Sequence, residues 1–351
     1  MNKTAHIVNH ALTIRDVLKK MDTENIDFVV AVNNTNKVTG VFTSGDFSRA
    51  VLNGVDIQQK ISEILNKNFL YLKQGFLKQT ARSLFNKNNL VMCIPIVNKK
   101  FELVKIVERK DIFSNLELKK KTIFKNFPVI IIAGGKGTRL KPFTNVLPKP
   151  LIPYKNDTIL KSVLNKFLQF SFNNFYVSLN EKANIIKAYL DEFKSEFNIK
   201  FIEEKKPLGT AGPLGLLKKK LTSTFFVANC DILINSHYPS MIEFHKSNNF
   251  DLTIISSLKN YSIPYGVCEL DKTGRLKNIR EKPELNFLVN TGLYLMEPKI
   301  LKLIPANRDF NMIELINKAK KKKMKIGSFP VSENSWIDVG EWNEYFKNNK
   351  P

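Results

Sequence analysis

From residue 128 onward, short apolar runs alternate with longer stretches in which apolar positions recur at helical spacing. The runs predict strands, and strands apolar at nearly every position are typical of a sheet buried on both faces. They lie at Val129–Ala133, Phe175–Leu179, Ile199–Glu203, Thr224–Ala228 and Leu252–Leu258, with helical patterns at Ile159–Phe170, Lys182–Phe193, Thr210–Lys220 and Pro239–Lys246. This alternation predicts an α/β fold with a Rossmann-like, mixed but mostly parallel sheet, whose ligands bind at the C-terminal ends of the strands.

The first 120 residues contain an internal repeat with a period of about 65 residues. Each copy reads helix, strand, turn, strand, Asp, helix, and Asp46 and Asp111 close the two equivalent units. We therefore expect an α+β region of two modules, about 1–60 and 61–120, ahead of the α/β domain. A polar, lysine-rich linker at 121–127 would join this region to a second domain at 128–351.

Composition narrows the class of protein. The 351 residues include 55 Lys and Arg against 32 Asp and Glu, a net charge of +23. Such a surface suits anionic partners, but the lysines are scattered and form no aromatic-interleaved groove, so nucleic-acid binding is not favoured. No apolar run is long enough to span a membrane. The three cysteines lack metal-ligand or disulfide spacing, and we expect a cytoplasmic protein.

The segment Ala133-Gly134-Gly135-Lys136-Gly137-Thr138-Arg139 follows the first strand of the second domain. Glycines let backbone N–H groups approach a phosphate, a helix starting just afterwards would direct its own N–H groups at the same anion, and Arg adds a fork suited to phosphate oxygens. Lys149 brings a second cation about ten residues further on. An ordinary strand-to-loop turn is the alternative interpretation.

This segment, with Pro148-Lys149-Pro150, resembles the Gly-Gly-x-Gly-Thr-Arg-Leu…Pro-Lys-Pro motif of the sugar-1-phosphate nucleotidyltransferases. The resemblance implies an enzyme that forms an NDP-sugar and pyrophosphate from an NTP and a sugar 1-phosphate. It implies that Ala133, Gly134, Gly135, Gly137 and Thr138 bind the nucleotide, and that Arg139 and Lys149 are catalytic cations.

Two aspartates are expected to hold Mg²⁺, which prefers carboxylate and phosphate oxygens. Asp231 comes directly after an apolar strand, in Asn229-Cys230-Asp231, where a loop cap is the alternative role. Asp338 lies in Trp336-Ile337-Asp338-Val339-Gly340, which resembles the Trp-x-Asp-x-Gly motif of the family. The resemblance implies that the fold brings these two catalytic carboxylates together, since spacing alone cannot pair them.

The run Pro207-Leu208-Gly209-Thr210-Ala211-Gly212 resembles the family's nucleobase loop, so Pro207 and Gly209 are expected beside the base. Glu204 stands where relatives selecting uracil or thymine often carry Gln. A carboxylate only accepts hydrogen bonds, which suits the adjacent N–H donors of guanine and not the carbonyl-flanked N–H of uracil. We therefore expect GTP. The alternative is a solvent-facing Glu204 beside Lys205 and Lys206.

Elements for the sugar phosphate follow in family order. The resemblance assigns sugar hydroxyls or phosphate to Gly266, Glu281, Lys282, Asn290 and Thr291. The domain order resembles the glucosamine-1-phosphate guanylyltransferases of bacterial legionaminic acid synthesis, so glucosamine 1-phosphate is the expected acceptor, with mannose 1-phosphate as the alternative.

The N-terminal repeat resembles a tandem pair of CBS modules. Gly40-Val41-Phe42-Thr43-Ser44-Gly45-Asp46 matches the module's Gly-x-x-Thr-x-x-Asp pattern, which implies an adenine nucleotide held by Thr43 and Asp46. Asp111 is the corresponding candidate ligand in the second copy, although that copy departs from the pattern around it. Helix N-capping is the alternative role of both aspartates. CBS pairs often associate, so we expect a homo-oligomer. A scaffold without catalysis is the alternative for the whole chain.

Overall fold

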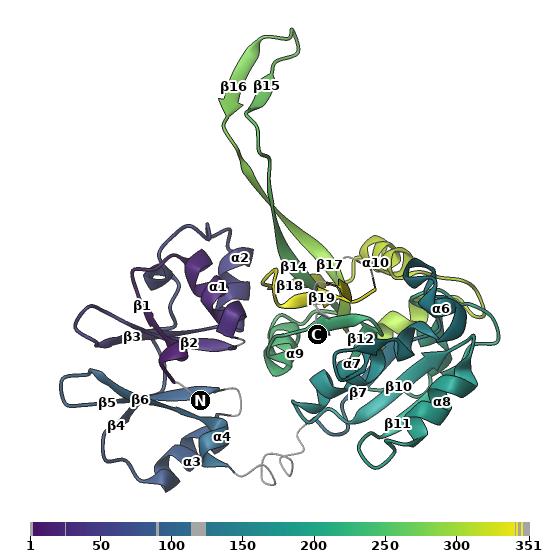
Figure 1. Cartoon of the computed structure of the whole chain (residues 1–351), viewed down its shortest axis with the longest axis horizontal. Helices are drawn as coiled ribbons and strands as arrows, with labels where there is room; N and C mark the ends of the chain where they lie inside the picture. Colours follow the sequence, from purple (N-terminus) through teal and green to yellow (C-terminus); the bar gives the residue numbers. More distant parts are fainter. Residues whose placement is uncertain are drawn as a thin grey trace.

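The computed structural model describes residues 3–24, 26–88, 91–113, 124–340, 342 and 345–346 (Figure 1). The predicted linker at 121–127 falls partly outside these residues. An N-terminal body and a larger body lie side by side, and a slender arm projects away from both. No helix among the described residues is long and apolar enough to cross a membrane.

The N-terminal body consists of two three-stranded sheets with the same connectivity. In each sheet a short first strand pairs parallel to the second, and the second pairs antiparallel to the third. The first unit contains η1 (Lys3–His6), β1 (Ile7–Asn9), α1 (Ile14–Glu24), β2 (Phe28–Val32), β3 (Val38–Thr43), α2 (Ser44–Leu52) and η2 (Ile61–Glu63). The second contains β4 (Leu72–Lys73), α3 (Lys78–Lys87), β5 (Cys93–Val97), β6 (Leu103–Glu108) and α4 (Arg109–Ile112). The repeat seen in the sequence is thus a repeat of structure.

The larger body is built on a seven-stranded sheet in the order β11-β10-β7-β12-β17-β14-β18. Its strands are β7 (Pro128–Ile132), β10 (Asn174–Leu179), β11 (Ile199–Glu203), β12 (Phe225–Asn229), β14 (Leu252–Ser262), β17 (Glu284–Met296) and β18 (Ile326–Val331). Within it, β17 runs antiparallel to both of its neighbours, and the other neighbouring pairs are parallel. The predicted fold class, mixed and mostly parallel, is confirmed.

Both faces of this sheet are covered, as the apolar runs predict. Val129 and Ile131 of β7 belong to one apolar core, while Ile130 and Ile132 belong to a second core on the other face. One core receives α7 (Ile159–Leu168), α8 (Ala183–Asp191) and α9 (Tyr238–Ser247). The other receives η5 (Gly212–Leu217), η6 (Pro298–Leu303) and α10 (Met312–Lys321).

Two helix predictions were wrong. The glycine-rich loop is followed by a 3₁₀ turn, η3 (Thr138–Leu140), and a single turn, α6 (Phe143–Val146), instead of a helix with its N-terminus at a phosphate. Prolines interrupt the chain there, and η4 (Lys149–Leu151), β8 (Pro153–Tyr154) and β9 (Asp157–Thr158) are equally short. The predicted helix at Thr210–Lys220 is the 3₁₀ segment η5, whose sequence includes Gly212-Pro213 and Gly215.

Beyond the edge of the sheet, β14 and β17 continue as a two-stranded ribbon, tipped by β15 (Val267–Leu270) and β16 (Leu276–Arg280). We call residues 259–287 the arm; Figure 1 shows it projecting from the molecule. The N-terminal body contacts the lower part of the arm, where Arg15 donates hydrogen bonds to both carboxylate oxygens of Glu284 at 3.0 and 2.9 Å. Leu258, at the foot of the ribbon, belongs to the apolar core of the first N-terminal unit.

Candidate active site

Asp231 and Asp338 are brought together by a small second sheet. Asp231 immediately precedes β13 (Ile232–Ile234), and Asp338 is the last residue of β19 (Trp336–Asp338). The two strands pair antiparallel with Ile232 opposite Asp338, and the Val339 N–H donates to the Asp231 carbonyl at 3.0 Å. Residues more than a hundred positions apart therefore become neighbours through strand pairing, which is the arrangement that the sequence could not establish.

Three functional groups converge over Gly340. A Cβ placed on this glycine would lie within 3.0 Å of Asp231 Oδ2, Asp338 Oδ1 and Lys149 Nζ. Lys149 is buried and forms an ion pair with Asp231, while the Gly340 N–H donates to Asp338 Oδ1 at 2.8 Å. A hydrogen atom is the largest side chain that leaves these groups room to meet.

The electrostatics of the cluster favour a bound cation. Burial raises the pKa of Asp338, and the nearby Asp231 carboxylate raises it further, while the charges of Lys149 and Arg139 oppose the rise. Two adjacent carboxylates share one ammonium, so a divalent cation would relieve their repulsion. Cys230 lies beside them, but burial raises the pKa of its thiol to about 12, which leaves it unreactive.

The donor set fits Mg²⁺ and does not fit a metal held by protein alone. Among the described residues no group of three or more His, Cys, Asp and Glu side chains could hold a metal ion. Magnesium usually takes one or two carboxylates and completes its shell with substrate phosphates and water. Asp231 and Asp338 supply that pair.

The glycine-rich loop wraps around Lys149. Gly137 has a φ of 65°, and a Cβ there would lie 2.7 Å from Lys149 Cβ and 2.9 Å from Thr144 Cγ2, so only glycine fits. Gly135 has open space where its Cβ would be, and Thr138 and Arg139 are exposed. Ala133 is buried at the end of β7, so the loop offers bare backbone and one guanidinium above the carboxylate cluster.

Glu204 faces the same loop and does not face solvent. Its side chain is buried against Gly134, and its Oε2 accepts a hydrogen bond from the Leu208 N–H at 3.1 Å. Its other oxygen, Oε1, is buried and has no well-shaped hydrogen bond with any described residue. Burial raises its pKa, although Leu208 and Ser178 moderate the rise. Pro207 is exposed next to it, and Gly209, at φ 76°, packs against the backbone of Phe310.

The residues expected to hold the sugar phosphate divide into two groups. Gly266, Glu281 and Lys282 lie on the arm, where Glu281 Oε2 is near Gly266 and the Lys282 N–H donates to the Tyr265 carbonyl at 3.3 Å. No described contact joins these three residues to the carboxylate cluster.

Asn290 and Thr291 lie close to the cluster, because a Cβ on the adjacent Gly292 would touch Asn229. The Thr291 hydroxyl, however, is buried and donates to the Ile255 carbonyl at 2.7 Å, so it serves the strand pairing. The Asn290 amide donates to the Tyr294 hydroxyl at 2.8 Å and remains exposed.

Thr43 and Asp46 form a helix cap and also line a cleft. The Thr43 N–H and hydroxyl donate to Asp46 Oδ2 at 2.8 and 2.7 Å, a capping box at the start of α2. Both residues face a cleft of about 840 Å³ between the two N-terminal units, and its further wall is α9 of the larger body. Asp111 caps α4 and lines a separate cleft of about 550 Å³.

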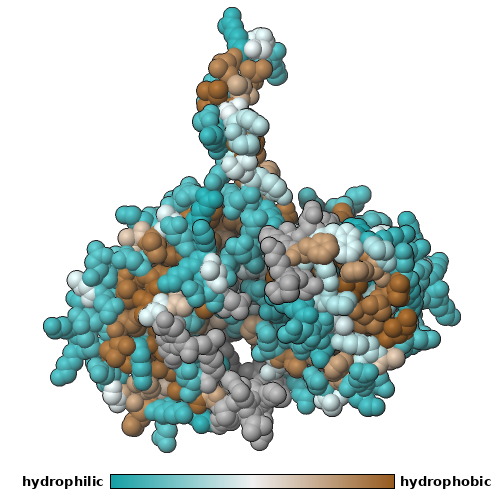
Figure 2. All heavy atoms as spheres, viewed as in Figure 1, coloured by the Kyte–Doolittle hydropathy of each residue, from teal (hydrophilic) through white to brown (hydrophobic). Residues whose placement is uncertain are grey.

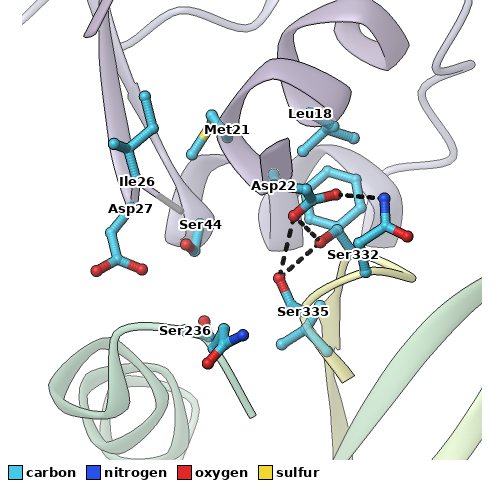
Figure 3. Close-up of a pocket in the computed structure, with 13 residues that line it drawn as sticks. Leu18, Met21, Asp22, Ile26, Asp27, Ser44, Ser236, Ser332 and Ser335 are labelled. Atoms are coloured by element: carbon cyan, nitrogen blue, oxygen red, sulfur yellow. Dashed lines mark hydrogen bonds between the residues drawn. The ribbon is translucent and has the colours of Figure 1, made fainter. Parts of the chain in front are cut away.

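Sequence reasoning missed the residues that join the two bodies. Asp22 on α1 accepts hydrogen bonds from Ser332 at 2.7 Å, Asn334 at 3.2 Å and Ser335 at 3.4 Å (Figure 3). The Asn235 N–H donates to the Ser335 carbonyl at 2.7 Å. These loops carry no recognisable motif; their position directly after β13 and directly before β19 becomes visible only in the fold.

A family model described as nucleotidyl transferase matches residues 128–351, and one described as CBS domain matches residues 1–53. A mannose-1-phosphate guanylyltransferase 1 of Arabidopsis thaliana is 31% identical over 231 residues, and a mannose-1-phosphate guanyltransferase of Aspergillus oryzae is 30% identical over 226. Each match covers 62% of this chain, and 62% and 61% of those proteins, so the chain spans less than two thirds of their length.

Solved structures are similar over the same region. HddC from Yersinia pseudotuberculosis is 27% identical with a TM-score of 0.51, covering 63% of this chain and 97% of that one. A putative glucose-1-phosphate thymidylyltransferase from Bacillus anthracis, 21% identical with a TM-score of 0.50, covers 64% of this chain and 94% of that one and shows the same fold.

Proposed function

The chain belongs to the nucleotidyl transferase family, and we propose that it transfers the nucleotidyl group of GTP to a sugar 1-phosphate with release of pyrophosphate. One observation carries the proposal: Asp231, Asp338 and Lys149 converge over Gly340, beside a glycine-rich loop that offers open backbone. A site that must join two polyanions needs these components, namely cations, a pair of metal-binding carboxylates and room for phosphates.

The reaction needs no protein nucleophile, because a phosphate oxygen of the sugar 1-phosphate attacks the α-phosphorus and pyrophosphate leaves. Lys149 would hold the α-phosphate, where charge builds up, and Arg139 would hold the β- and γ-phosphates. In the free protein the Lys149 ammonium is paired with Asp231. Mg²⁺, when bound by Asp231 and Asp338, would neutralise phosphate charge between the two substrates.

Glu204 supports guanine as the base. Among the residues that the structure describes, none forms a well-shaped hydrogen bond with its buried Oε1, and a buried acceptor in this state is stabilised by any donor that reaches it. Guanine presents two N–H donors side by side, and their hydrogen bonds would favour the ionised carboxylate and lower its pKa again. The relatives named as guanylyltransferases agree with this choice.

For the acceptor we propose a hexose or hexosamine 1-phosphate. The names of the relatives above favour mannose 1-phosphate. The order of a CBS domain followed by a nucleotidyl transferase domain resembles that of the glucosamine-1-phosphate guanylyltransferases of legionaminic acid synthesis, and this resemblance favours glucosamine 1-phosphate. Among the residues near the cluster, Asn290 is an exposed side chain that could contact sugar hydroxyls.

We further propose that an adenine nucleotide in the cleft at Thr43 and Asp46 controls turnover. The cleft is walled by α9, including Ser240 and Phe244.

Three residues separate β13 from α9, and the first of them, Asn235, donates its N–H to the Ser335 carbonyl. Asp22 accepts hydrogen bonds from Ser332 and Ser335 of the same loop (Figure 3). This loop leads into β19, which ends at Asp338, and Asp231 directly precedes β13, whose other end leads to Asn235. Both candidate metal-binding carboxylates are therefore connected through one strand each to the loop that Asp22 contacts.

The regulatory route has a direct test. Asp22→Ala removes the acceptor of three hydrogen bonds without touching the cleft or the carboxylates. We expect AMP, ADP or ATP to change the turnover of the wild-type protein and to change that of the variant much less, although calorimetry should report equal nucleotide affinity for both. Equal responses of the two proteins would exclude this route.

The test of the function itself is a pyrophosphate-release screen of four NTPs against hexose and hexosamine 1-phosphates, with Mg²⁺ and with EDTA. We expect turnover with GTP, loss of it in EDTA, and a loss on the order of 100-fold or more in Lys149→Ala. Folded protein without turnover on any pair would refute the proposal and favour a scaffold role.

A further inference from the structure

The arm separates part of the expected sugar-phosphate site from the rest. β17 is continuous from Glu284 to Met296, and Gly292 within it lies against Asn229, next to the carboxylate cluster. At about 3.3 Å per residue, Glu284 lies about 25 Å from Gly292 along the strand. Lys282 is further out still, and its side chain reaches only about 6 Å. Within one chain, Lys282 and Glu281 therefore do not reach Asp231.

The arm is built to stay extended. All 11 residues of β14 pair with β17, from Leu252 opposite Met296 to Ser262 opposite Glu284. Arg15 of the N-terminal body clamps Glu284 with two hydrogen bonds where the ribbon leaves the molecule. Folding the arm back onto its own active site would break this ladder and this ion pair.

The tip of the arm has one apolar and one polar face. Cys268 pairs with Ile279 and Leu270 pairs with Leu276, so these four side chains share one face. On this face Ile279 is 58% exposed, Leu270 60% and Leu276 59%. On the polar face Arg280 and Glu269 form an ion pair at 2.7 Å. Nearer the body, Tyr261 and Phe287 are more than half exposed. Figure 2 shows apolar residues gathered on the surface near the tip of the arm.

The exposed apolar face of this two-stranded ribbon indicates that another molecule covers it. A lone hairpin is marginally stable in water, and exposed apolar patches mark interaction surfaces. The occupant must also explain why Lys282 and Glu281 are carried on this ribbon. A second copy of the chain satisfies both requirements, because it offers a site that lacks the same two residues, and a reciprocal exchange closes a two-fold dimer.

We propose that the arm crosses to a second copy of this chain and places Lys282 and Glu281 beside that copy's Asp231 and Asp338. Each sugar-phosphate site is then composed of two chains, with Lys282 neutralising the attacking phosphate. This inference rests on the proposed function for its catalytic part, and on the apolar tip for its dimeric part.

Complementation between two inactive variants tests the catalytic part. Asp231→Asn lacks a metal ligand and Lys282→Ala lacks the arm's cation, so each alone should lose at least 100-fold in turnover. Co-expressed with different tags and purified through both, the pair should recover about half of the wild-type rate, because one of its two sites is intact. The pair Asp231→Asn with Asp338→Asn should recover nothing, since both lesions lie on the same body. Lys277→Ala, an exposed lysine elsewhere on the arm, should keep wild-type turnover.

The dimeric part has its own measurement, which does not depend on turnover. Light scattering should show a dimer for the wild-type full chain and a monomer for Ile279→Asp, with circular dichroism unchanged. A monomeric wild-type protein, or a dimeric and fully active Ile279→Asp, would overturn the inference. An active wild type whose first pair does not complement would also overturn it, since the arm then serves its own chain. An inactive wild type would instead count against the proposed function.

Discussion

Gly340 offers the sharpest perturbation of the candidate active site, because its substitution replaces none of the three functional side chains and acts only by displacing them. A methyl group in Gly340→Ala would lie within 3.0 Å of Asp231 Oδ2, Lys149 Nζ and Asp338 Oδ1. Real Cβ atoms essentially never approach other heavy atoms so closely, so all three groups must retreat together. The φ of Gly340 lies outside the left-handed region, so an alanine backbone is tolerated there.

The expected loss follows from the size of that retreat. Asp231 and Lys149 are buried and cannot swing freely into solvent, so the displacement falls on the geometry that holds the phosphates. A misplacement of about 1 Å at reacting groups can cost about 100-fold in rate, equivalent to about 2.7 kcal/mol in the barrier. We therefore expect kcat for pyrophosphate release to fall by about 100-fold while the melting temperature changes little.

Gly215→Ala is the matched control. Its added methyl would meet the Ile304 side chain at 3.2 Å in the core on the other face of the sheet, away from the cluster. This variant should keep wild-type kcat. Full turnover in Gly340→Ala, with the same melting temperature as wild type, would show that the substrates do not meet above this glycine.

Three further outcomes are expected. Glu204→Gln, which supplies an amide donor where guanine requires an acceptor, should lower kcat/KM for GTP at least tenfold and raise it for UTP or TTP; an unchanged preference would remove Glu204 from base selection. Arg139→Ala should raise KM for the nucleotide and lower kcat, and wild-type kinetics would argue against its contact with the β- and γ-phosphates. Burial and the charge of Arg109 lower the pKa of His237 from 6.5 to about 4, so the unfolded chain binds this proton at a higher pH than the folded protein does. As the pH falls from 6.5 to about 4, the free energy of unfolding should therefore decrease by up to about 1.4 kcal/mol per pH unit. His237→Gln should reduce this slope in urea titrations.

The sequence predicts the central sheet because its strands are unambiguous. Val129 to Ile132 are apolar without interruption, and the structure indeed buries their alternate members in two cores. The glycine-rich motif correctly predicts a loop there but not a helix after it, since proline and glycine decide between α and 3₁₀ geometry within a few residues. The pattern of apolar residues predicts that the strand beginning at Leu252 ends at Leu258, whereas pairing with β17 extends this strand, β14, to Ser262. Strand ends depend on partners that no local pattern specifies.

The sequence names the residues of the candidate site, but it does not show how they are assembled. Asp231 at a strand end could be proposed from its position, but its pairing with Asp338 depends on the antiparallel contact of β13 and β19, two strands of three residues each. Thr291 shows the opposite case: its place in a motif suggests a ligand, while its hydroxyl is bound to the Ile255 carbonyl. Lys282 and Glu281 were recognisable by motif, yet only the three-dimensional arrangement reveals that they are carried out on the arm.

The claim that Asp231 and Asp338 act as one site is tested most directly by a double-mutant cycle on turnover. Groups that act as a unit lose their effect together, so Asp231→Asn, Asp338→Asn and the double variant should each reduce kcat by a similar factor, on the order of 100-fold or more. Losses that multiply in the double variant, or a single variant that keeps near wild-type turnover, would contradict the account.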